Sequence, residues 1–455
     1  MSASLVVLGG GPAGLAVAHY ATRRGIPFTL YERSTELGGL CRTFQCGPHR
    51  YDAGAHRFHD RDAEATADMR GLLGDHLVAV DAPSRIYDGR RFIDFPPTPL
   101  GMLFSGGIGQ IGRIGRDLIR SRRPGRPCVT FADFAIAQFG ETLARRFLIH
   151  YSEKLWGLPA EQLSPDIATR RLSGMTLRSL LVEVLAPRRK TEHIDGRFLY
   201  PLSGYGELAA ALAASVPAES LRTEHDVIGL DVRDDRVVRV RFADRPAVEV
   251  ADRLVSTLPL TVLVRLLGTS VPDAAHRAAS TLRFRSIRLV FLRLARPRVS
   301  TSASLYLPDP SLCVARVTEP KNRSSRMAPA DETSLVAEVP CFMGDPVSQL
   351  ADAALVERVT GELARVGLTR PHEVIEWRHH LLPNAYPVYA LDWSGTVAEV
   401  VAGVRSIRNL DLLGRGGLFL YSHLHDQLRL GKDFVSDLVA PRAATDSAEA
   451  NARPI

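Results

Sequence analysis

The chain begins with a strand, a glycine-rich turn and a helix, and this combination restricts the fold more than any other feature. Residues 4–8 form a short apolar run typical of a buried strand, and G-G-G-P-A-G follows at 9–14. Residues 15–24 have the small side chains of a helix packed on a sheet, and a second apolar run at 27–31 ends at Glu32. We therefore predict a βαβ dinucleotide-binding unit.

Three glycines and one acid in this unit each have a separate task. Gly9 permits the tight turn, Gly11 lets the backbone approach a pyrophosphate, and Gly14 lets the helix and strand pack closely. The helix N-terminus then faces the phosphate charge. Glu32 can accept hydrogen bonds from a ribose diol and would repel a 2′-phosphate, which argues against NADP.

A second glycine pair indicates which dinucleotide is bound. The segment L-G-G-L-C-R-T at 37–43 lies just past Glu32. It resembles the second glycine motif of FAD enzymes in the flavin amine oxidase group, which includes protoporphyrinogen oxidases and phytoene desaturases. The resemblance implies that Gly38 and Gly39 let the chain run along the FAD pyrophosphate, and that Arg42 adds positive charge. FAD is the predicted cofactor.

The net charge of +7 is unevenly spread along the 455 residues. One short stretch holds Arg113, Arg116, Arg120, Arg122, Arg123 and Arg126. Three interpretations stay open: a solvated helix end and loop, a membrane-surface contact, or capture of an anionic substrate. Nucleic acid is excluded as a partner, because no recognition module or aromatic-basic interleaving accompanies the cluster.

The cysteines and the N-terminus favour a cytoplasmic protein. The five cysteines are odd in number and form no C-x-x-C, which excludes a disulfide framework and a zinc site, so no metal is predicted. The N-terminus lacks the basic region of a signal peptide. No stretch resembles a transmembrane helix, since prolines and glycines interrupt the longest uncharged span, 95–112. Region 95–126 leaves open a peripheral membrane contact, against a loop packed on its own core.

The length favours two domains, and we predict an α/β fold with a Rossmann-type FAD-binding domain and a discontinuous α+β substrate domain. The FAD-binding domain is assigned residues 1–90, 195–260 and 395–439, and the substrate or cap domain 91–194 and 261–394. Residues 440–455 have the composition of a disordered tail. The patterns also predict strands at 226–232, 237–242, 254–258 and 288–294, and helices at 130–146 and 207–212.

Four further motifs narrow the resemblance. They are Y-D-A-G-A-H-R-F-H at 51–59, Y-S-E-K-L-W-G at 151–157, A-Y-P-V-Y at 385–389 and L-G-R-G-G-L-F-L-Y at 413–421. Taken in this order after the first unit, they resemble UDP-galactopyranose mutases and the related protoporphyrinogen-oxidase-like proteins. The resemblance runs from Leu5 to about Val435.

The resemblance implies roles at matching positions. The loop Gly54–His56 would pass beside the isoalloxazine ring, with His56 near its reactive edge, and Val227 would contact the adenine through its backbone. Gly414 and Arg415 would lie at the pyrimidine end, where donors stabilise negative charge at N1 of the reduced flavin.

The predicted cofactor-binding residues are Gly9, Gly11, Pro12, Ala13, Gly14, Glu32, Arg33, Gly39, Leu40, Arg42, Gly54, Ala55, His56, Val227, Gly414, Arg415, Asp426 and Gln427. The predicted catalytic residues are His56, Tyr386, Tyr389 and Arg285. The last cysteine is Cys341, so the C-terminal motif offers none for a flavin link, and FAD is expected to be bound non-covalently.

One departure from the mutases bears on function. Those enzymes clamp a substrate diphosphate with two arginines. The first falls at Met175 here, with Arg178 as the nearest substitute, and Arg285 matches the second. Methionine cannot bind phosphate bidentately as a guanidinium does, which counts against UDP-galactopyranose as the substrate.

Two enzymatic functions follow, both on a small-molecule substrate. The first is an FAD-dependent oxidoreductase that moves a hydride to flavin N5. The alternative is a redox-neutral sugar nucleotide mutase in which reduced FAD acts as a nucleophile. A third, non-enzymatic role as an FAD-stabilised structural protein has no positive sequence feature. The sequence identifies no substrate, electron acceptor or oligomeric state.

Overall fold

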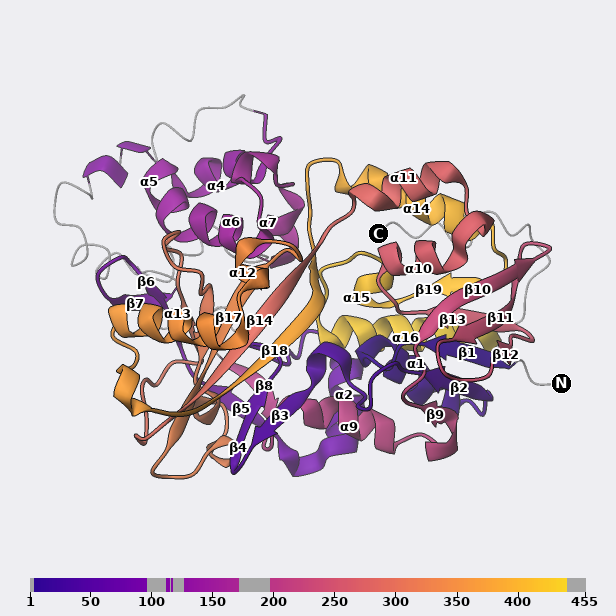
Figure 1. Cartoon of the computed structure of the whole chain (residues 1–455), viewed down its shortest axis with the longest axis horizontal. Helices are drawn as coiled ribbons and strands as arrows, with labels where there is room; N and C mark the ends of the chain where they lie inside the picture. The colour runs from indigo at the N-terminus through magenta and orange to yellow at the C-terminus, as the bar shows by residue number, and fades with distance from the viewer. Residues whose placement is uncertain (1–3, 96–111, 115, 118–126, 172–196, 440–455) are drawn as a thin grey trace.

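A five-stranded sheet with parallel pairing throughout forms one half of the molecule (Figure 1). The computed structural model describes residues 4–95, 112–114, 116–117, 127–171 and 197–439. The sheet has the order β19 (Leu410–Leu412), β13 (Arg253–Ser256), β1 (Leu5–Leu8), β2 (Phe28–Tyr31) and β9 (Leu221–Arg222). The predicted βαβ unit is confirmed, because the helix α1 (Pro12–Arg23) connects β1 to its parallel neighbour β2.

The central strand β1 is apolar at every position because both faces of the sheet are covered. Leu5 and Val7 pack with the helices α1, α9 (Gly206–Ala214) and α16 (Leu424–Val439). Val6 and Leu8 pack on the other side with a three-stranded antiparallel sheet. That sheet comprises β10 (Val227–Arg233), β11 (Arg236–Phe242) and β12 (Val248–Glu249). A strand buried on both faces has no polar alternation, as the sequence of β1 indicated.

The second half is built on a seven-stranded sheet, antiparallel except where β15 pairs with β6. Its order is β18 (Val374–Pro387), β14 (Phe284–Leu294), β17 (Thr333–Cys341), β16 (Arg316–Thr318), β15 (Ser304–Tyr306), β6 (Ser84–Tyr87) and β7 (Phe92–Phe95). The helix α13 (Asp352–Arg365) covers one face (Figure 1). The hairpin of β3 (Thr43–Cys46) and β4 (His49–Asp52) covers the other and connects this sheet to the first half.

The sheet pairing moves two of the expected domain boundaries. Strand β6 falls within 1–90 but pairs with β15, so the second sheet draws on the chain from about residue 84. The helices α10 (Leu260–Leu267) and α11 (Asp273–Thr281) fall within 261–394 but lie over the first half, against β10 and α14 (Trp393–Arg405). Local patterns identify a strand or a helix, but the partner that it joins depends on distant residues.

The predicted helix at 130–146 is divided in two. A capping box of Thr130 and Asp133 starts α4 (Phe131–Phe139), which ends where Gly140 adopts a φ of 74°. The short α5 (Glu141–Leu143) and a π-helical turn (Ala144–Ile149) then lead into α6 (His150–Trp156). The other α-helices and strands of the described chain are α2 (Ala63–Leu73), β5 (Leu77–Asp81), α7 (Asp166–Arg171), β8 (Arg197–Pro201), α12 (Pro346–Gln349) and α15 (Gly414–Gly417).

Several predicted features lie outside the described residues: most of 95–126, Met175, Arg178 and the tail 440–455. In the part of the chain that the structure describes, no helix combines the length and the apolar character that crossing a bilayer requires. The five cysteines are all free thiols.

Candidate functional site

A cavity of about 550 Å³ lies between the two halves of the molecule. On one side it is lined by residues that follow the carboxyl ends of parallel strands: Gly9 after β1, Glu32 after β2, Thr257 after β13 and Gly414 after β19. Open α/β sheets bind ligands at this edge. On the other side it is lined by residues of the seven-stranded sheet, among them Ser84, Tyr306, Arg316 and Tyr386.

One end of the cavity, called the nucleotide end here, is lined by Gly9, Gly11, Glu32, Arg33 and Asp226. The glycine turn after β1 forms its inner wall. Gly9 has a φ of 101°, which favours glycine. A Cβ on Gly14 would overlap the carbonyl oxygen of Gly9, so Gly14 allows α1 to pack against the turn. A Cβ on Gly11 would meet nothing within 4 Å, because Gly11 borders the cavity. Gly11 therefore leaves space for a ligand, while Gly14 leaves space for the protein itself.

The second glycine pair lies directly on this turn. The amide of Gly38 donates to the carbonyl of Gly10 at 2.8 Å, and a Cβ on Gly39 would come within 3.1 Å of the Gly11 Cα. Arg42 does not line the cavity, and its Nε donates to the carbonyl of Gly39 at 3.0 Å. The two glycine motifs thus form one surface, and Arg42 supports it from behind.

Residues just after β2 and at the start of β10 form the outer part of the nucleotide end. Oε2 of Glu32 accepts from the amide of Gly10 at 2.7 Å, and Arg33, Asp226 and Val227 line the cavity beside it. A carboxylate fixed in this way at the end of the second strand is placed to accept from a ribose.

The opposite end of the cavity, called the far end, is lined by His56, Arg57, Arg316 and Tyr386. There a buried ion pair supports the loop from Gly54 to His56. The amide of Ala55 donates to Oε1 of Glu338 at 2.9 Å, and Glu338 also pairs with Arg316 at 2.6 Å. His56 stacks on Tyr205, with 4.9 Å between ring centroids, and burial together with Arg316 and Arg415 lowers the pKa of His56 to about 3. Its Nε2 is buried with no hydrogen-bond partner among the described residues.

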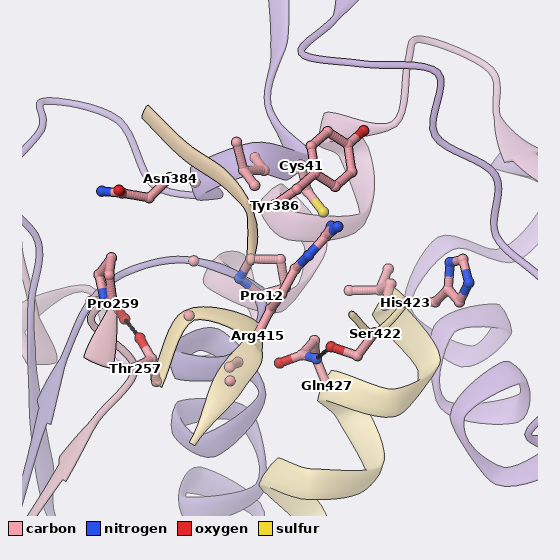
Figure 2. Close-up of a pocket in the computed structure, with 18 of the residues that line it drawn as sticks. Pro12, Cys41, Thr257, Pro259, Asn384, Tyr386, Arg415, Ser422, His423 and Gln427 are labelled. Atoms are coloured by element: carbon pink, nitrogen blue, oxygen red, sulfur yellow. Dashed lines mark hydrogen bonds between the residues drawn. The ribbon is translucent and has the colours of Figure 1, made fainter. Parts of the chain in front are cut away.

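Arg415 extends into the middle of the cavity (Figure 2). Its guanidinium carbon lies 4.8 Å from the ring centroid of Tyr386 and 4.7 Å from that of Tyr421. Its Nε and one terminal nitrogen are buried, and neither has a hydrogen-bond partner in the described part of the chain. Donors held in place by aromatic rings but left unsatisfied indicate a missing acceptor.

These observations fit the predicted cofactor. The two glycine motifs leave open space beside a helix N-terminus, where a pyrophosphate would bind. Glu32 is placed for a ribose, and Arg415 and His56 offer unsatisfied polar atoms where a flavin ring would provide acceptors and donors.

Most of the predicted cofactor-binding residues line the cavity, and four do not. Each of the four contacts a residue that does. Gly14 packs on Gly9, Arg42 binds the carbonyl of Gly39, a Cβ on Gly54 would come within 3.2 Å of His56 Nε2, and Asp426 accepts from the amide of His423 at 2.7 Å.

Of the predicted catalytic residues, His56 and Tyr386 line the cavity, but Tyr389 and Arg285 do not. Tyr389 is fully buried and stacks on Trp393 at 3.9 Å, and its hydroxyl accepts from the Tyr421 amide at 2.6 Å. Arg285 donates to the carbonyls of Lys154 and Leu155 and faces Asp345 at 3.4 Å. The structure thus corrects both assignments: these side chains hold elements together and do not face the cavity.

Sequence reasoning did not assign several polar residues of the far end: Arg57, His59, Arg61, Ser84, Tyr306, Arg316 and His423. Arg57 and His59 lie inside the quoted motif at 51–59, so their place in it was the one available signal. The others come from separate strands and loops, and no local pattern distinguishes them from ordinary surface or core residues.

Comparisons with known proteins agree with this geometry. The family model described as flavin containing amine oxidoreductase matches residues 12–420. A crystal structure of reduced UDP-galactopyranose mutase is similar, with a TM-score of 0.83, 21% identity, and coverage of 96% of this chain and 95% of that one. A putative protoporphyrinogen oxidase from Exiguobacterium sp. 255-15 has a TM-score of 0.75 and 21% identity, over 96% and 99% of the two chains. Putrescine oxidase bound to putrescine has a TM-score of 0.66 and 16% identity, over 97% and 100%.

Proposed function

The chain belongs to the family of flavin-containing amine oxidoreductases, and from this we propose that it is an FAD-dependent oxidoreductase that moves a hydride from a small-molecule substrate to flavin N5. Its cofactor is FAD. The observation that carries the proposal is one continuous cavity, with a dinucleotide-binding turn at one end and the buried polar atoms of His56 and Arg415 at the other. When bound there, FAD supplies the hydride acceptor.

The chain's own residues bind and orient the cofactor and the substrate. Gly9, Gly11 and the start of α1 would hold the pyrophosphate, and Glu32 the ribose. Glu338 positions two groups at once, the guanidinium of Arg316 and the backbone of the loop at Ala55. Glu338 thereby fixes the position of Arg316 relative to the loop at Gly54–His56. Hydride transfer from a bound substrate to a bound flavin requires such fixed positions.

Two side chains at the far end are held in their uncharged forms at neutral pH. Burial and the nearby arginines lower the pKa of His56 to about 3. Burial raises the pKa of Tyr386, whose hydroxyl lies 3.4 Å from a terminal nitrogen of Arg316. A neutral imidazole and a protonated phenol can hold a substrate through hydrogen bonds, and with its low pKa the imidazole acts as a hydrogen-bonding group and not as a strong base.

One observation favours the mutase as a second candidate: the TM-score of 0.83 with reduced UDP-galactopyranose mutase. Against it, Arg285 faces Asp345 and two backbone carbonyls, so the arginine that matched the phosphate clamp is already occupied. We therefore expect UDP to bind the FAD-loaded protein poorly. Micromolar binding of UDP, measured by calorimetry, would favour the mutase.

An anaerobic experiment tests the proposed function. Sugar nucleotides, polyprenols and amines are added one at a time to the FAD-loaded protein while the flavin absorbance is followed. Bleaching by one compound identifies a hydride donor and supports an oxidoreductase. Conversion of a compound only after reduction by dithionite supports the mutase, and a protein that cannot be reconstituted with FAD contradicts both.

A further inference from the structure

We propose that the far end of the cavity binds a negatively charged group of the substrate, a carboxylate or a phosphate, on the guanidinium of Arg57. The inference deepens the proposed function, because it rests on the assignment of this end to the substrate. It names a substrate class that the family match leaves open.

The charges that line the cavity are divided between its two ends. Both carboxylates of the described lining, Glu32 and Asp226, lie at the nucleotide end. The lining of the far end includes Arg57, Arg61, Arg316 and Arg415 and, within the described part of the chain, no carboxylate. A lining that holds guanidinium groups and no carboxylate produces a positive potential, which the low-dielectric walls of a cleft strengthen.

Two of these arginines have other tasks. Arg316 is neutralised by Glu338, with nitrogen–oxygen distances of 2.6–3.1 Å. Arg415 lies between two tyrosine rings, and the C-terminal flavin motif supplies it, so its free donors are assigned to the cofactor. Neither is therefore the best candidate for holding a substrate anion.

Arg57 differs from both of these arginines. One of its terminal nitrogens donates to the Ser84 hydroxyl at 2.7 Å, and its guanidinium carbon lies 4.9 Å from the ring centroid of Phe198. Among the described residues it forms no ion pair. A guanidinium has five N–H donors, so several remain for a ligand. Ser84 and Phe198 hold the fork in position, which favours bidentate binding of a planar carboxylate or a phosphate.

The lack of a counter-charge shows in the pKa of Arg57 and in that of its neighbour His59. Burial, with added repulsion from Arg323 and Arg316, lowers the pKa of Arg57. Burial, together with His423, Arg61 and Arg57, lowers the pKa of His59 to about 3. A half-buried charge without a counter-charge is costly, and a bound anion would reduce that cost. An ammonium group would raise it, so a diamine such as putrescine, which the similar putrescine oxidase binds, is not the expected substrate here.

Four probes that share one aromatic ring and differ in charge test the proposal: benzoate, phenyl phosphate, benzyl alcohol and benzylamine. Each is titrated into the FAD-loaded protein, and binding is followed as a difference in the flavin absorbance spectrum. We expect at least one anion to bind about tenfold or more tightly than the alcohol, and benzylamine more weakly than the alcohol. The tighter of the two anions identifies whether the site prefers carboxylate or phosphate.

Variants then locate the anion. Arg57→Gln is expected to weaken the anion about tenfold or more and to leave benzyl alcohol unchanged, while Arg57→Lys restores part of the affinity. Arg239→Gln, at an exposed position of strand β11 outside the cavity, is the control and should bind the anion as the wild type does. FAD occupancy is measured for every variant.

The proposal is overturned if benzylamine binds as tightly as the anions, if neither anion binds at millimolar concentration, or if Arg57→Gln with full FAD occupancy binds the anion normally. Should Arg57→Gln fail to retain FAD, the ranking of the four probes on the wild type decides. The proposed oxidoreductase fails by a different result, the absence of any compound that bleaches the flavin.

Discussion

The two ends of the cavity are built by different means. The nucleotide end is built mainly from two segments close in sequence, residues 9–13 and 31–41, and at its glycines the backbone is left open to a ligand because no side chain covers it. The far end is assembled from side chains on at least five separate segments, including Arg57, Ser84, Tyr306, Arg316 and Tyr386. A glycine turn can be inherited unchanged by many enzymes, while a set of scattered side chains can change one position at a time. The cofactor is therefore common to the family, and the substrate is not.

Gly11→Val should have the largest effect, because its side chain would enter the nucleotide end. The position has φ −75° and ψ −178°, which valine adopts readily, and no protein atom lies within 4 Å of the added Cβ. The fold should survive, but FAD binding should be lost. Flavin absorbance of the purified protein measures this. Gly361→Val, in open space on α13, is the control and should retain FAD. Full occupancy in Gly11→Val would place the phosphate site elsewhere.

Glu338→Gln tests whether the far end depends on a buried charge pair. The change leaves Arg316 without its counter-charge and weakens the bond to the Ala55 amide. Removing one partner of a buried ion pair destabilises a protein by about 3–5 kcal/mol. We expect a loss of that size in the free energy of unfolding measured with urea. Glu249→Gln removes an exposed partner of Arg239 and should cost about 1 kcal/mol or less. Equal stability of the two variants would contradict this account.

Glu32→Ala should weaken FAD binding without abolishing it. A lost charged hydrogen bond to the ribose costs about 1.5–3 kcal/mol, and Glu32 also fixes the turn through the Gly10 amide. The dissociation constant of FAD, from fluorescence titration of the apoprotein, measures the loss. Glu36→Ala is the matched control, because Glu36 is largely exposed and does not line the cavity. If both variants bind FAD equally, Glu32 has no part in nucleotide recognition.

The fourth expected effect is a pH dependence of stability to which the far end contributes. Burial lowers the pKa of His56 and His59 to about 3 and that of His423 to about 4, against 6.5 for an ordinary histidine. Between these values the unfolded chain binds more protons than the folded one, so stability is full above pH 6.5 and falls as the pH drops below it. Each histidine contributes at most about 1.4 kcal/mol per pH unit.

Urea unfolding across this pH range measures the slope. His59→Gln should flatten it, because glutamine has no proton to gain, whereas His372→Gln, an exposed position outside the cavity, should leave it unchanged. A slope in His59→Gln equal to that of the wild type would show that the His59 ring is not held neutral by its surroundings.

Local chemistry was enough to predict the nucleotide end. The turn at Gly9–Gly14, the pairing of β1 with β2, and the acid at Glu32 all depend on residues close in sequence, since backbone conformation and short connections are decided there. FAD followed from the resemblance of the second glycine pair to the motif of FAD enzymes, and the strands at β10, β11, β13 and β14 followed from their hydrophobic patterns.

The far end could not be predicted in the same way. Nothing local in the sequence distinguishes Arg285, which faces Asp345, from Arg57, which faces the cavity. Tyr386 and Tyr389 lie three residues apart in one motif, yet only the first lines the cavity. The assignment of β6 to the second sheet has the same origin. Which partner a side chain or a strand finds depends on residues hundreds of positions away, because burial and charge compensation are properties of the packed chain and not of its local sequence.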